Sequence, residues 1–272
     1  MTMSTKPCFI FYDSELYLPC GPELPAAVPE EFAGRIILEA EVCFPDNSCR
    51  GILLGPGSDR ASVICQSVGE GSCSGVRREG CWYRLRDLHA HTDPAFQVLS
   101  SPATRALGLL NWYDSARFCS FCGGGLQNHA HETALVCISC GRLLYPRISP
   151  AVIVLVEHPD GRILLARHKS RNQSVFSCIA GYLEHGERLE DCVRREVMEE
   201  TGLELDEIRY AGSQSWPYPD QYMIAFRARA KTTDIRIRPE ELLEARWFSL
   251  IDLPPHPAPG TVAWSLIHGK SL

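Results

Sequence analysis

The sequence predicts a protein of mixed α and β structure in three parts. Strand-like runs separated by Gly, Pro and Ser fill residues 1–114, two Cys-x-x-Cys motifs lie within 115–149, and buried strands followed by a charged helix occupy 150–272. These observations predict a β-rich N-terminal domain, a small metal-binding module and a C-terminal α/β domain.

Composition limits the classes of protein that the chain can belong to. Its 272 residues are 45% hydrophobic and 22% charged, which is typical of folded domains. The longest apolar run, 151–156, is far shorter than the ~20 residues that span a membrane, and the first residues lack the pattern of an export signal. A net charge of −6 argues against holding duplex nucleic acid by charge alone. We therefore expect a soluble protein with no membrane partner.

The cysteines indicate a reducing compartment. Their number, 13, is odd and most are scattered, which does not suggest a disulfide framework. Most are expected to be small buried hydrophobic residues in a cytoplasmic protein.

The N-terminal part has strand-like runs at 35–44, 61–68 and 81–88. After Pro102, apolar residues recur with nearly helical spacing, which predicts a helix leading into the cysteine motifs.

The four clustered cysteines have the spacing of a zinc ribbon. Two Cys-x-x-Cys pairs are separated by fourteen residues, and each pair is followed by glycine, Gly123 or Gly141, which is expected to relieve crowding near sulfur. The predicted ligands are Cys119, Cys122, Cys137 and Cys140. A redox role is the alternative for a single pair, but two pairs favour metal. Four sulfur ligands leave no position open for water, so the one zinc ion per chain should be structural; His129 and His131 should be surface residues.

The C-terminal part begins with two buried strands within 151–168, joined by a turn at Pro159–Gly161. A proline-rich loop, 254–259, and a short helix from Thr261 end it.

Three glutamates on one predicted helix indicate a site for a divalent cation. Glu196 and Glu200 lie one helical turn apart, with Glu199 beside them. Carboxylates at this spacing repel one another, and a bound Mg²⁺ or Mn²⁺ would neutralise them. The alternative is an ordinary solvated helix face.

The segment from Gly181 to Leu203 resembles the signature of the Nudix hydrolases. The matching positions are Gly181, Glu187, Arg195, Glu196, Val197, Glu199, Glu200, Gly202 and Leu203. The resemblance implies an α/β/α sandwich with a mixed sheet and hydrolysis of a nucleoside diphosphate linked to another group. It also implies that Glu196, Glu199 and Glu200 are catalytic metal-binding carboxylates and that Arg195 pairs with Glu187 to shape the loop.

A second segment resembles the SQPWPFPxS array of the NADH pyrophosphatase subfamily. Here it reads SQSWPYP over 213–219, with Ser215, Tyr218 and Gln221 differing from the array. A zinc ribbon before a Nudix domain, after a β-rich domain, is also that subfamily's architecture.

This resemblance implies the remaining site residues. The substrate-binding residues would be Glu132, Tyr145, Tyr182, Gln214, Ser215, Trp216, Pro217, Tyr218, Pro219, Asp220, Gln221 and Ala263. Aromatic rings among them can stack on the two rings of a dinucleotide. The backbone carbonyl of Ala180 and the side chain of Glu241 would join Glu196 and Glu200 as ligands of Mg²⁺ or Mn²⁺, with Glu244 as the alternative to Glu241.

The implied activity is hydrolysis of NAD(H) to AMP and NMN(H) by a homodimer that uses two or three Mg²⁺ or Mn²⁺ ions per site. NAD-capped RNA is a further implied substrate. One alternative is a Nudix hydrolase that acts on ADP-ribose, dinucleoside polyphosphates or other nucleotides. Another is a regulatory or nucleic-acid-binding module whose Nudix domain only senses a ligand, although its complete set of glutamates argues against this.

Overall fold

A computed structural model describes residues 7–19, 21–44, 47–54, 81–169 and 174–271. The chain forms two compact units: the first comprises residues 1–147 with 217–220, and the second 148–216 with 221–272. The strand expected over 61–68 lies outside the described residues. Among those that are described, no helix has both the length and the apolar character needed to cross a bilayer.

The first unit contains a five-stranded sheet with the order β3-β4-β1-β2-β5. Its strands are β1 (Cys8–Tyr12), β2 (Glu15–Leu18), β3 (Ile36–Phe44), β4 (Asn47–Leu54) and β5 (Cys81–Arg84). Strands β1 and β4 are parallel and the other neighbours are antiparallel. A short 3-10 helix, η1 (Glu30–Arg35), precedes β3.

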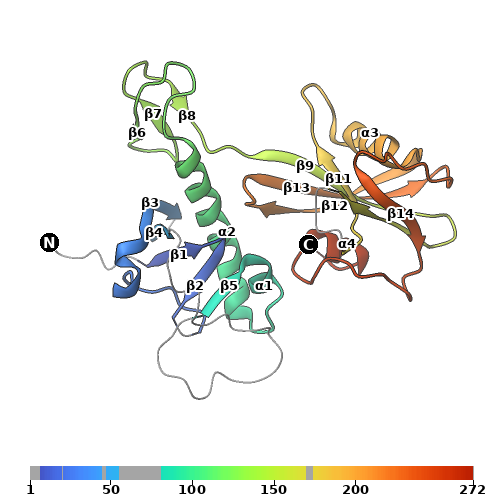
Figure 1. Cartoon of the computed structure of the whole chain (residues 1–272), viewed down its shortest axis with the longest axis horizontal. Coiled ribbons are helices and arrows are strands. Elements are labelled where there is room, and N and C mark those ends of the chain that lie inside the picture. The colour runs from blue at the N-terminus through green and yellow to red at the C-terminus, as the bar shows by residue number, and fades with distance from the viewer. Residues whose placement is uncertain (1–6, 20, 45–46, 55–80, 170–173, 272) are drawn as a thin grey trace. The chain divides into compact units, whose positions relative to one another are not determined.

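Helix α2 (Pro94–Ser115) covers one face of this sheet (Figure 1). The Asp93 side chain caps its start by accepting a hydrogen bond from the Ala95 N–H. The helix passes through Pro102, so the helix expected after that residue is its second half, and Leu107 and Leu110 are buried in the core. The run at 81–88 is divided between β5 and helix α1 (Leu85–His89).

The ribbon is a three-stranded sheet of β6 (Leu126–Asn128), β7 (Leu135–Cys137) and β8 (Leu143–Leu144). Leu126, Leu135 and Leu144 pack against the same core as α2. The ribbon is therefore part of the first unit and packs in the same hydrophobic core as α2.

The second unit contains a six-stranded mixed sheet with the order β12-β13-β9-β10-β14, in which β11 also pairs with β9. Its strands are β9 (Ser149–Glu157), β10 (Ile163–His168), β11 (Ile179–Tyr182), β12 (Leu205–Trp216), β13 (Gln221–Ala230) and β14 (Leu242–Phe248). Strands β9 and β13 are parallel and the other pairs are antiparallel.

Both faces of this sheet are covered by helices. On β9, Val152 and Val154 pack in the core that includes α3 (Leu189–Thr201), whereas Ile153 and Leu155 pack in the core that includes α4 (Val262–Ile267). A strand buried on both faces needs apolar residues at every position, which explains the continuous apolar run. The expected α/β/α sandwich is confirmed (Figure 1).

The two strands expected within 151–168 form, but they are not a regular hairpin. Gly161 has a φ of +92° in the connecting turn, and only Ile163 and Glu157 pair between β10 and β9. Strand β11 then pairs with β9 instead, over Ile179–Tyr182. This exchange of partners brings Gly181 beside the centre of the sheet and within reach of α3.

Candidate functional site

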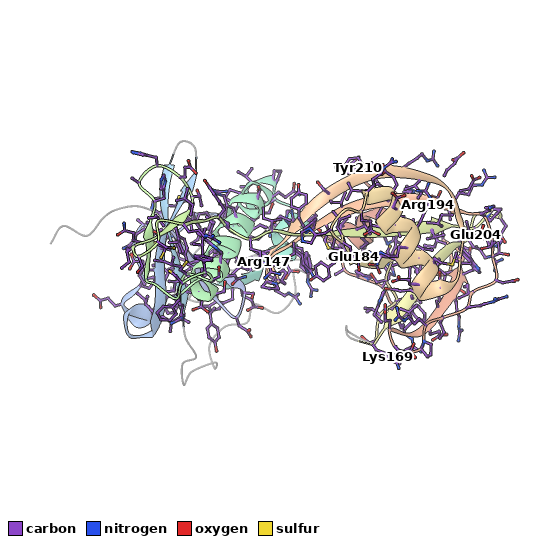
Figure 2. The ribbon with its side chains drawn as sticks, turned by 90° about the horizontal axis from the view of Figure 1, so that it is seen from above. Arg147, Lys169, Glu184, Arg194, Glu204 and Tyr210 are labelled. Carbon is purple, nitrogen blue, oxygen red and sulfur yellow. The ribbon has the colours of Figure 1, made fainter. Side chains whose placement is uncertain are left out.

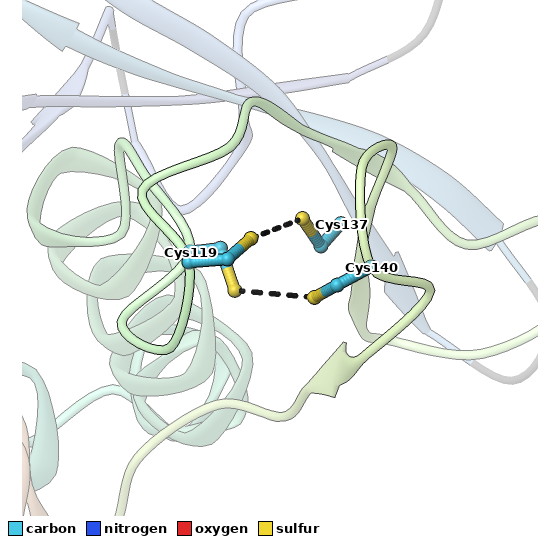
Figure 3. A group of neighbouring side chains, drawn as sticks. Cys119, Cys137 and Cys140 are labelled. Atoms are coloured by element: carbon cyan, nitrogen blue, oxygen red, sulfur yellow. Dashed lines mark hydrogen bonds between the residues drawn. The ribbon is translucent and has the colours of Figure 1, made fainter.

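The four ribbon cysteines form a site suited to a tetrahedral metal ion. Their sulfur atoms all lie within 4.8 Å of one another, and the Sγ–Sγ distances are 3.8 Å from Cys119 to Cys140 and 3.5 Å from Cys122 to Cys137 (Figure 3). Zinc bound by four sulfurs at about 2.3 Å would place them about 3.8 Å apart. The geometry fits the predicted structural zinc ion.

Backbone amides in the two turns lower the pKa of two of the four sulfurs. The backbone of Cys122 and then of Phe121 lowers the pKa of Cys119, and the backbone of Cys140 and then of Ser139 lowers that of Cys137 to about 6. At Cys122 the Gly124 backbone acts in the same direction, but the sulfurs of Cys140 and Cys137 outweigh it and raise the pKa to about 12. A lower thiol pKa favours zinc binding, because the proton must leave before sulfur binds the metal.

The glycines have different roles from the one expected. Gly123 and Gly141 have φ values of +73° and +72°, and a Cβ at either position would meet open space, so it is their backbone conformation that requires glycine. Crowding occurs instead at Gly124, where a Cβ would lie 2.5 Å from Ser139 Oγ and 3.0 Å from Cys137 Sγ.

The two ribbon histidines lie outside the sulfur cluster, as expected. His131 is exposed and His129 is partly buried, and the His131 N–H donates to His129 Nδ1 at 3.4 Å.

Helix α3 places two carboxylates on its buried face. Glu196 and Glu200 follow Val193 and Val197 at helical spacing and are only 8% and 3% exposed. The helix ends at Gly202, whose φ of +69° is the left-handed conformation of a glycine cap. Because burying a carboxylate costs free energy, this pair is costly to fold without compensating charge.

The glycine that begins the signature makes room for one of these carboxylates. A Cβ at Gly181 would lie 1.9 Å from Glu196 Cδ. Burial raises the pKa of Glu196, and the negative charges of Glu199 and Glu241 raise it further, although Arg195 acts in the opposite direction. A divalent cation would favour the charged form, so both the space and the chemistry of this group fit a metal ligand.

Arg195 forms the expected ion pair with the loop carboxylate. Its Nε and Nη2 donate to the two oxygens of Glu187 at 2.7 and 2.9 Å, and Nη2 also donates to the Tyr182 carbonyl at 3.0 Å. Arg195 holds the pKa of Glu187 down at about 2. Arg195 Nη1 reaches Glu196 at 2.8 Å and Glu199 at 3.4 Å, which links the loop to the helix.

His168 is a neighbour of the cluster that the sequence analysis did not identify. At the end of β10, its Nδ1 lies 3.8 Å from Glu200 Oε2, and both side chains are buried. Its position at the end of a strand was the only signal for it in the sequence.

The segment between β13 and β14 carries two further charged residues to α3. The Arg236 and Arg238 N–H groups donate to the Thr201 and Glu200 carbonyls at 2.8 and 3.0 Å and so cap the helix. Arg238 Nη1 then lies 3.0 Å from Glu241 Oε1 and 4.0 Å from Glu199 Oε2. The sequence analysis missed Arg238, because nothing in the sequence indicates that this segment caps α3.

Glu241 and Glu244 differ in their position relative to β14: Glu241 precedes the strand beside Arg238, whereas Glu244 lies within it. Glu244 is paired in register with Arg167 and accepts a hydrogen bond from it at 2.5 Å. Arg167 lies over the ring of Phe176, which packs in the α4 core, so Glu244 belongs to the face opposite α3. This geometry favours Glu241 over Glu244 as a ligand beside the α3 carboxylates.

Several expected substrate residues lie in the second unit. Gln221 Nε2 donates to the hydroxyl of Tyr182, which is half-exposed at the end of β11. Gln214 donates to the Gly260 carbonyl at 2.9 Å and accepts from the Val262 N–H at 2.8 Å, so it fixes the start of α4 next to Ala263. The other members on β12 are the exposed Ser215 and the partly buried Trp216, and Ala180, expected as a metal ligand, is buried on β11.

The remaining expected residues lie in the first unit. Asn111 Nδ2 donates to the carbonyls of Pro217 and Pro219 at 2.9 and 3.2 Å, and Tyr218 packs against the core that contains α2. Asp220 pairs with Arg147 at 3.2 Å. In the ribbon, the Tyr145 hydroxyl donates to Glu132 at 2.7 Å.

Family models match two adjacent segments of the chain. Residues 147–265 match the NUDIX domain, and residues 114–145 match the NADH pyrophosphatase zinc ribbon domain. The chain belongs to the Nudix family. The zinc expected at the ribbon is thus supported both by this match and by the sulfur geometry.

Relatives of this Nudix protein share the matched region. Proteins named NAD-capped RNA hydrolase NudC from Shigella boydii and Salmonella heidelberg are each 44% identical to it, over 170 and 165 residues. These matches cover 62% and 61% of this chain and 66% and 64% of the relatives, slightly less than two thirds of their length. A solved Nudix hydrolase from Nitrosomonas europaea is 25% identical and covers 57% of this chain and 94% of its own, with a TM-score of 0.45.

Proposed function

We propose that this Nudix protein hydrolyses the pyrophosphate bond of NAD(H), producing AMP and NMN(H). The observation that carries the proposal is the pair of buried carboxylates, Glu196 and Glu200, on the apolar face of α3. Their burial costs free energy that a bound cation would offset, and Gly181 leaves the space that Glu196 occupies.

The metal ligands that we propose are Glu196, Glu200, Glu241 and the carbonyl of Ala180, with Glu199 assisting. Oxygen donors favour Mg²⁺ or Mn²⁺, and we propose two or three ions per site. When bound, such ions lower the pKa of a coordinated water and neutralise charge on the phosphates. The protein's own contribution is to hold these oxygens in place: Arg195 fixes the loop, and the cap at Arg236 and Arg238 fixes the segment that carries Glu241.

The proposal that the substrate is a dinucleotide is supported by aromatic side chains of the second unit. Tyr182 is half-exposed next to Gly181, and Trp216 lies at the end of β12. Such rings can stack on the adenine and nicotinamide groups. The names of the relatives support NAD-capped RNA as a second substrate, in which the same bond would be cut.

We also propose a homodimer with composite active sites, as the family resemblance implies, in which the Trp-Pro-Tyr-Pro segment, 216–219, serves the site of the neighbouring subunit. Light scattering tests this directly, and a monomer with full activity would overturn it. Trp216→Ala should raise KM for NADH more than it lowers kcat, because stacking contributes to substrate and transition-state binding alike.

A cytoplasmic location is proposed from the cysteines. Their odd number and scattered spacing do not suggest a disulfide framework, and such cysteines fit a reducing compartment.

The activity is tested by incubating the protein with NADH and Mn²⁺ or Mg²⁺ and separating the products. AMP and NMNH are expected in equal amounts, and Glu200→Gln should lower kcat at least about 100-fold while the protein remains folded and retains zinc.

The matched control is Glu190→Gln, on the same helix. Glu190 is exposed and lies 3.7 Å from Arg188, so this variant should remain within about twofold of the parent. Hydrolysis at the parent rate by Glu200→Gln would overturn the assignment of this site.

A further inference from the structure

A guanidinium lies among the oxygens that a divalent ion would need. Arg238 Nη1 is 3.0 Å from Glu241 Oε1 and 4.0 Å from Glu199 Oε2, and Nε is 4.0 Å from Glu240. Among the described residues, its side chain contacts only these carboxylates. Arg238 therefore provides positive charge where metal would otherwise provide it.

The fold fixes this position. The backbone N–H of Arg238 donates to the Glu200 carbonyl at the end of α3, and its carbonyl accepts from the N–H groups of Glu241 and Leu242 at 3.1 and 3.0 Å. The guanidinium is thus attached to a backbone that is tied to the helix on one side and to the start of β14 on the other.

The two arginines of the cluster are held differently. Arg195 is anchored outside the cluster by two hydrogen bonds to Glu187 and one to the Tyr182 carbonyl, and its side chain is 24% exposed. Arg238 has no such anchor among the described residues, and its side chain is 46% exposed. Arg238 can leave the carboxylates by turning into solvent, whereas Arg195 cannot do so without breaking the loop.

Among the described residues, no three carboxylates of the cluster are as close together as the ligands of one ion would be. An ion with oxygens at about 2.1 Å holds neighbouring ligand atoms about 3 Å apart. Within the described parts of the chain, the cysteines are the group of three or more potential ligands whose atoms all lie within 4.8 Å. For Glu199 and Glu241 to bind an ion together, the guanidinium that contacts both of them must give up its contacts.

We propose that Arg238 is an internal counter-ion that competes with the divalent cation for Glu199 and Glu241, and so sets the metal concentration at which the site fills. The inference rests on the proposed function, because it assumes that these carboxylates bind metal. It assigns to Arg238 a positioning role: the residue stabilises the metal-free cluster and weakens metal binding.

The test measures binding of Mn²⁺ by calorimetry to the full chain with its ribbon zinc retained, as checked by metal analysis. Arg238→Gln removes the competing charge, and the Kd for Mn²⁺ should fall about fivefold at low salt, since an exposed ion pair changes an equilibrium by up to about that factor. The difference should shrink at high salt, which screens exposed charges.

Arg194→Gln is the matched control. Arg194 lies on α3 (Figure 2) and contacts only the Glu190 carbonyl and Asp191 among the described residues, so its substitution removes the same charge without freeing the cluster. Its Kd for Mn²⁺ should stay within about twofold of the parent value.

A second measurement addresses stability without metal. The increase in Tm caused by Mn²⁺ should be larger for Arg238→Gln than for the parent, because the metal-free variant leaves Glu241 without this counter-ion and Glu199 with Arg195 only. An unchanged or weaker affinity in Arg238→Gln would overturn the inference even if NADH hydrolysis is normal. If Arg238→Gln binds Mn²⁺ more tightly as expected but the parent does not hydrolyse NADH, the proposed function is overturned instead.

Discussion

The zinc ribbon and the glutamate cluster on α3 assemble metal ligands in different ways. In the ribbon, each Cys-x-x-Cys turn is a local structure, and pairing of β6 with β7 brings the two turns together within a span of 22 residues, Cys119 to Cys140. The glutamate cluster combines a helix, strand β11 and the segment before β14, which are distant in sequence. Its oxygens are paired with arginines, whereas the sulfurs are already at the spacing of zinc.

This difference in assembly matches the difference between a structural metal site and a hydrolytic one. A structural site is stable when every position on the metal is filled by the protein. A hydrolytic site must leave positions for water and substrate, so its ligands cannot collapse onto one ion. Arginines that neutralise the carboxylates without occupying the positions of metal, water and substrate are consistent with this requirement.

Removing one ribbon ligand should have the largest effect. Cys119→Ser should abolish stoichiometric zinc binding and unfold the ribbon, since structural zinc contributes on the order of 10 kcal/mol to small domains. Metal analysis and proteolysis of the ribbon check this. A variant that lacks zinc but is as stable as the parent would contradict this prediction, because the ribbon would then fold without metal.

Within the glutamate cluster, Gly181→Ala should lower stability and activity more than any other change that leaves every glutamate in place. Its Cβ would collide with the Glu196 carboxylate, so the unfolding free energy should fall by about 2–3 kcal/mol and NADH hydrolysis by about 100-fold. Denaturant titration and kinetics measure the two effects. Gly34→Ala, where the new Cβ meets open space, should change stability by less than about 0.5 kcal/mol; equal effects at the two glycines would contradict the proposed contact.

The pair between Glu187 and Arg195 predicts a defined dependence of stability on pH. Because the pKa of Glu187 is about 2 in the folded protein and about 4.3 when unfolded, the stabilisation is fully present above the unfolded value and disappears as pH falls through about 2. Glu187→Gln should cost about 2 kcal/mol at pH 7 and progressively less below pH ~4. A loss that does not depend on pH would show that the charge of Glu187 is not responsible.

The smallest expected effect separates Glu241 from Glu244. Glu241→Gln should weaken Mn²⁺ binding about tenfold, because it removes an oxygen ligand and its charge, whereas Glu244→Gln should leave the affinity unchanged and lower stability slightly. Calorimetry on both variants distinguishes them. A tenfold loss at Glu244 alone would mean that the ligands come from the opposite face of the sheet.

Much of the site follows from local spacing. The sulfur ligands could be predicted because a Cys-x-x-Cys turn defines its own geometry, and the Glu196–Glu200 pair because helical periodicity places them on one face. The apolar run of β9 likewise indicates a strand buried on both faces. These features depend on residues within a few positions of one another, so the sequence by itself determined them.

Only the tertiary structure decided which distant residues complete the cluster. Strand β11 replaces β10 beside β9, which brings Gly181 against Glu196, and the cap on α3 brings Arg238 and Glu241 to the carboxylates. The choice between Glu241 and Glu244 depends on the register of β14, which places Glu244 on the face opposite α3, and on the turn at Arg238, which places Glu241 before the strand. Backbone hydrogen bonds make these contacts, and every residue but proline can donate one, so side-chain identity carries no signal for them.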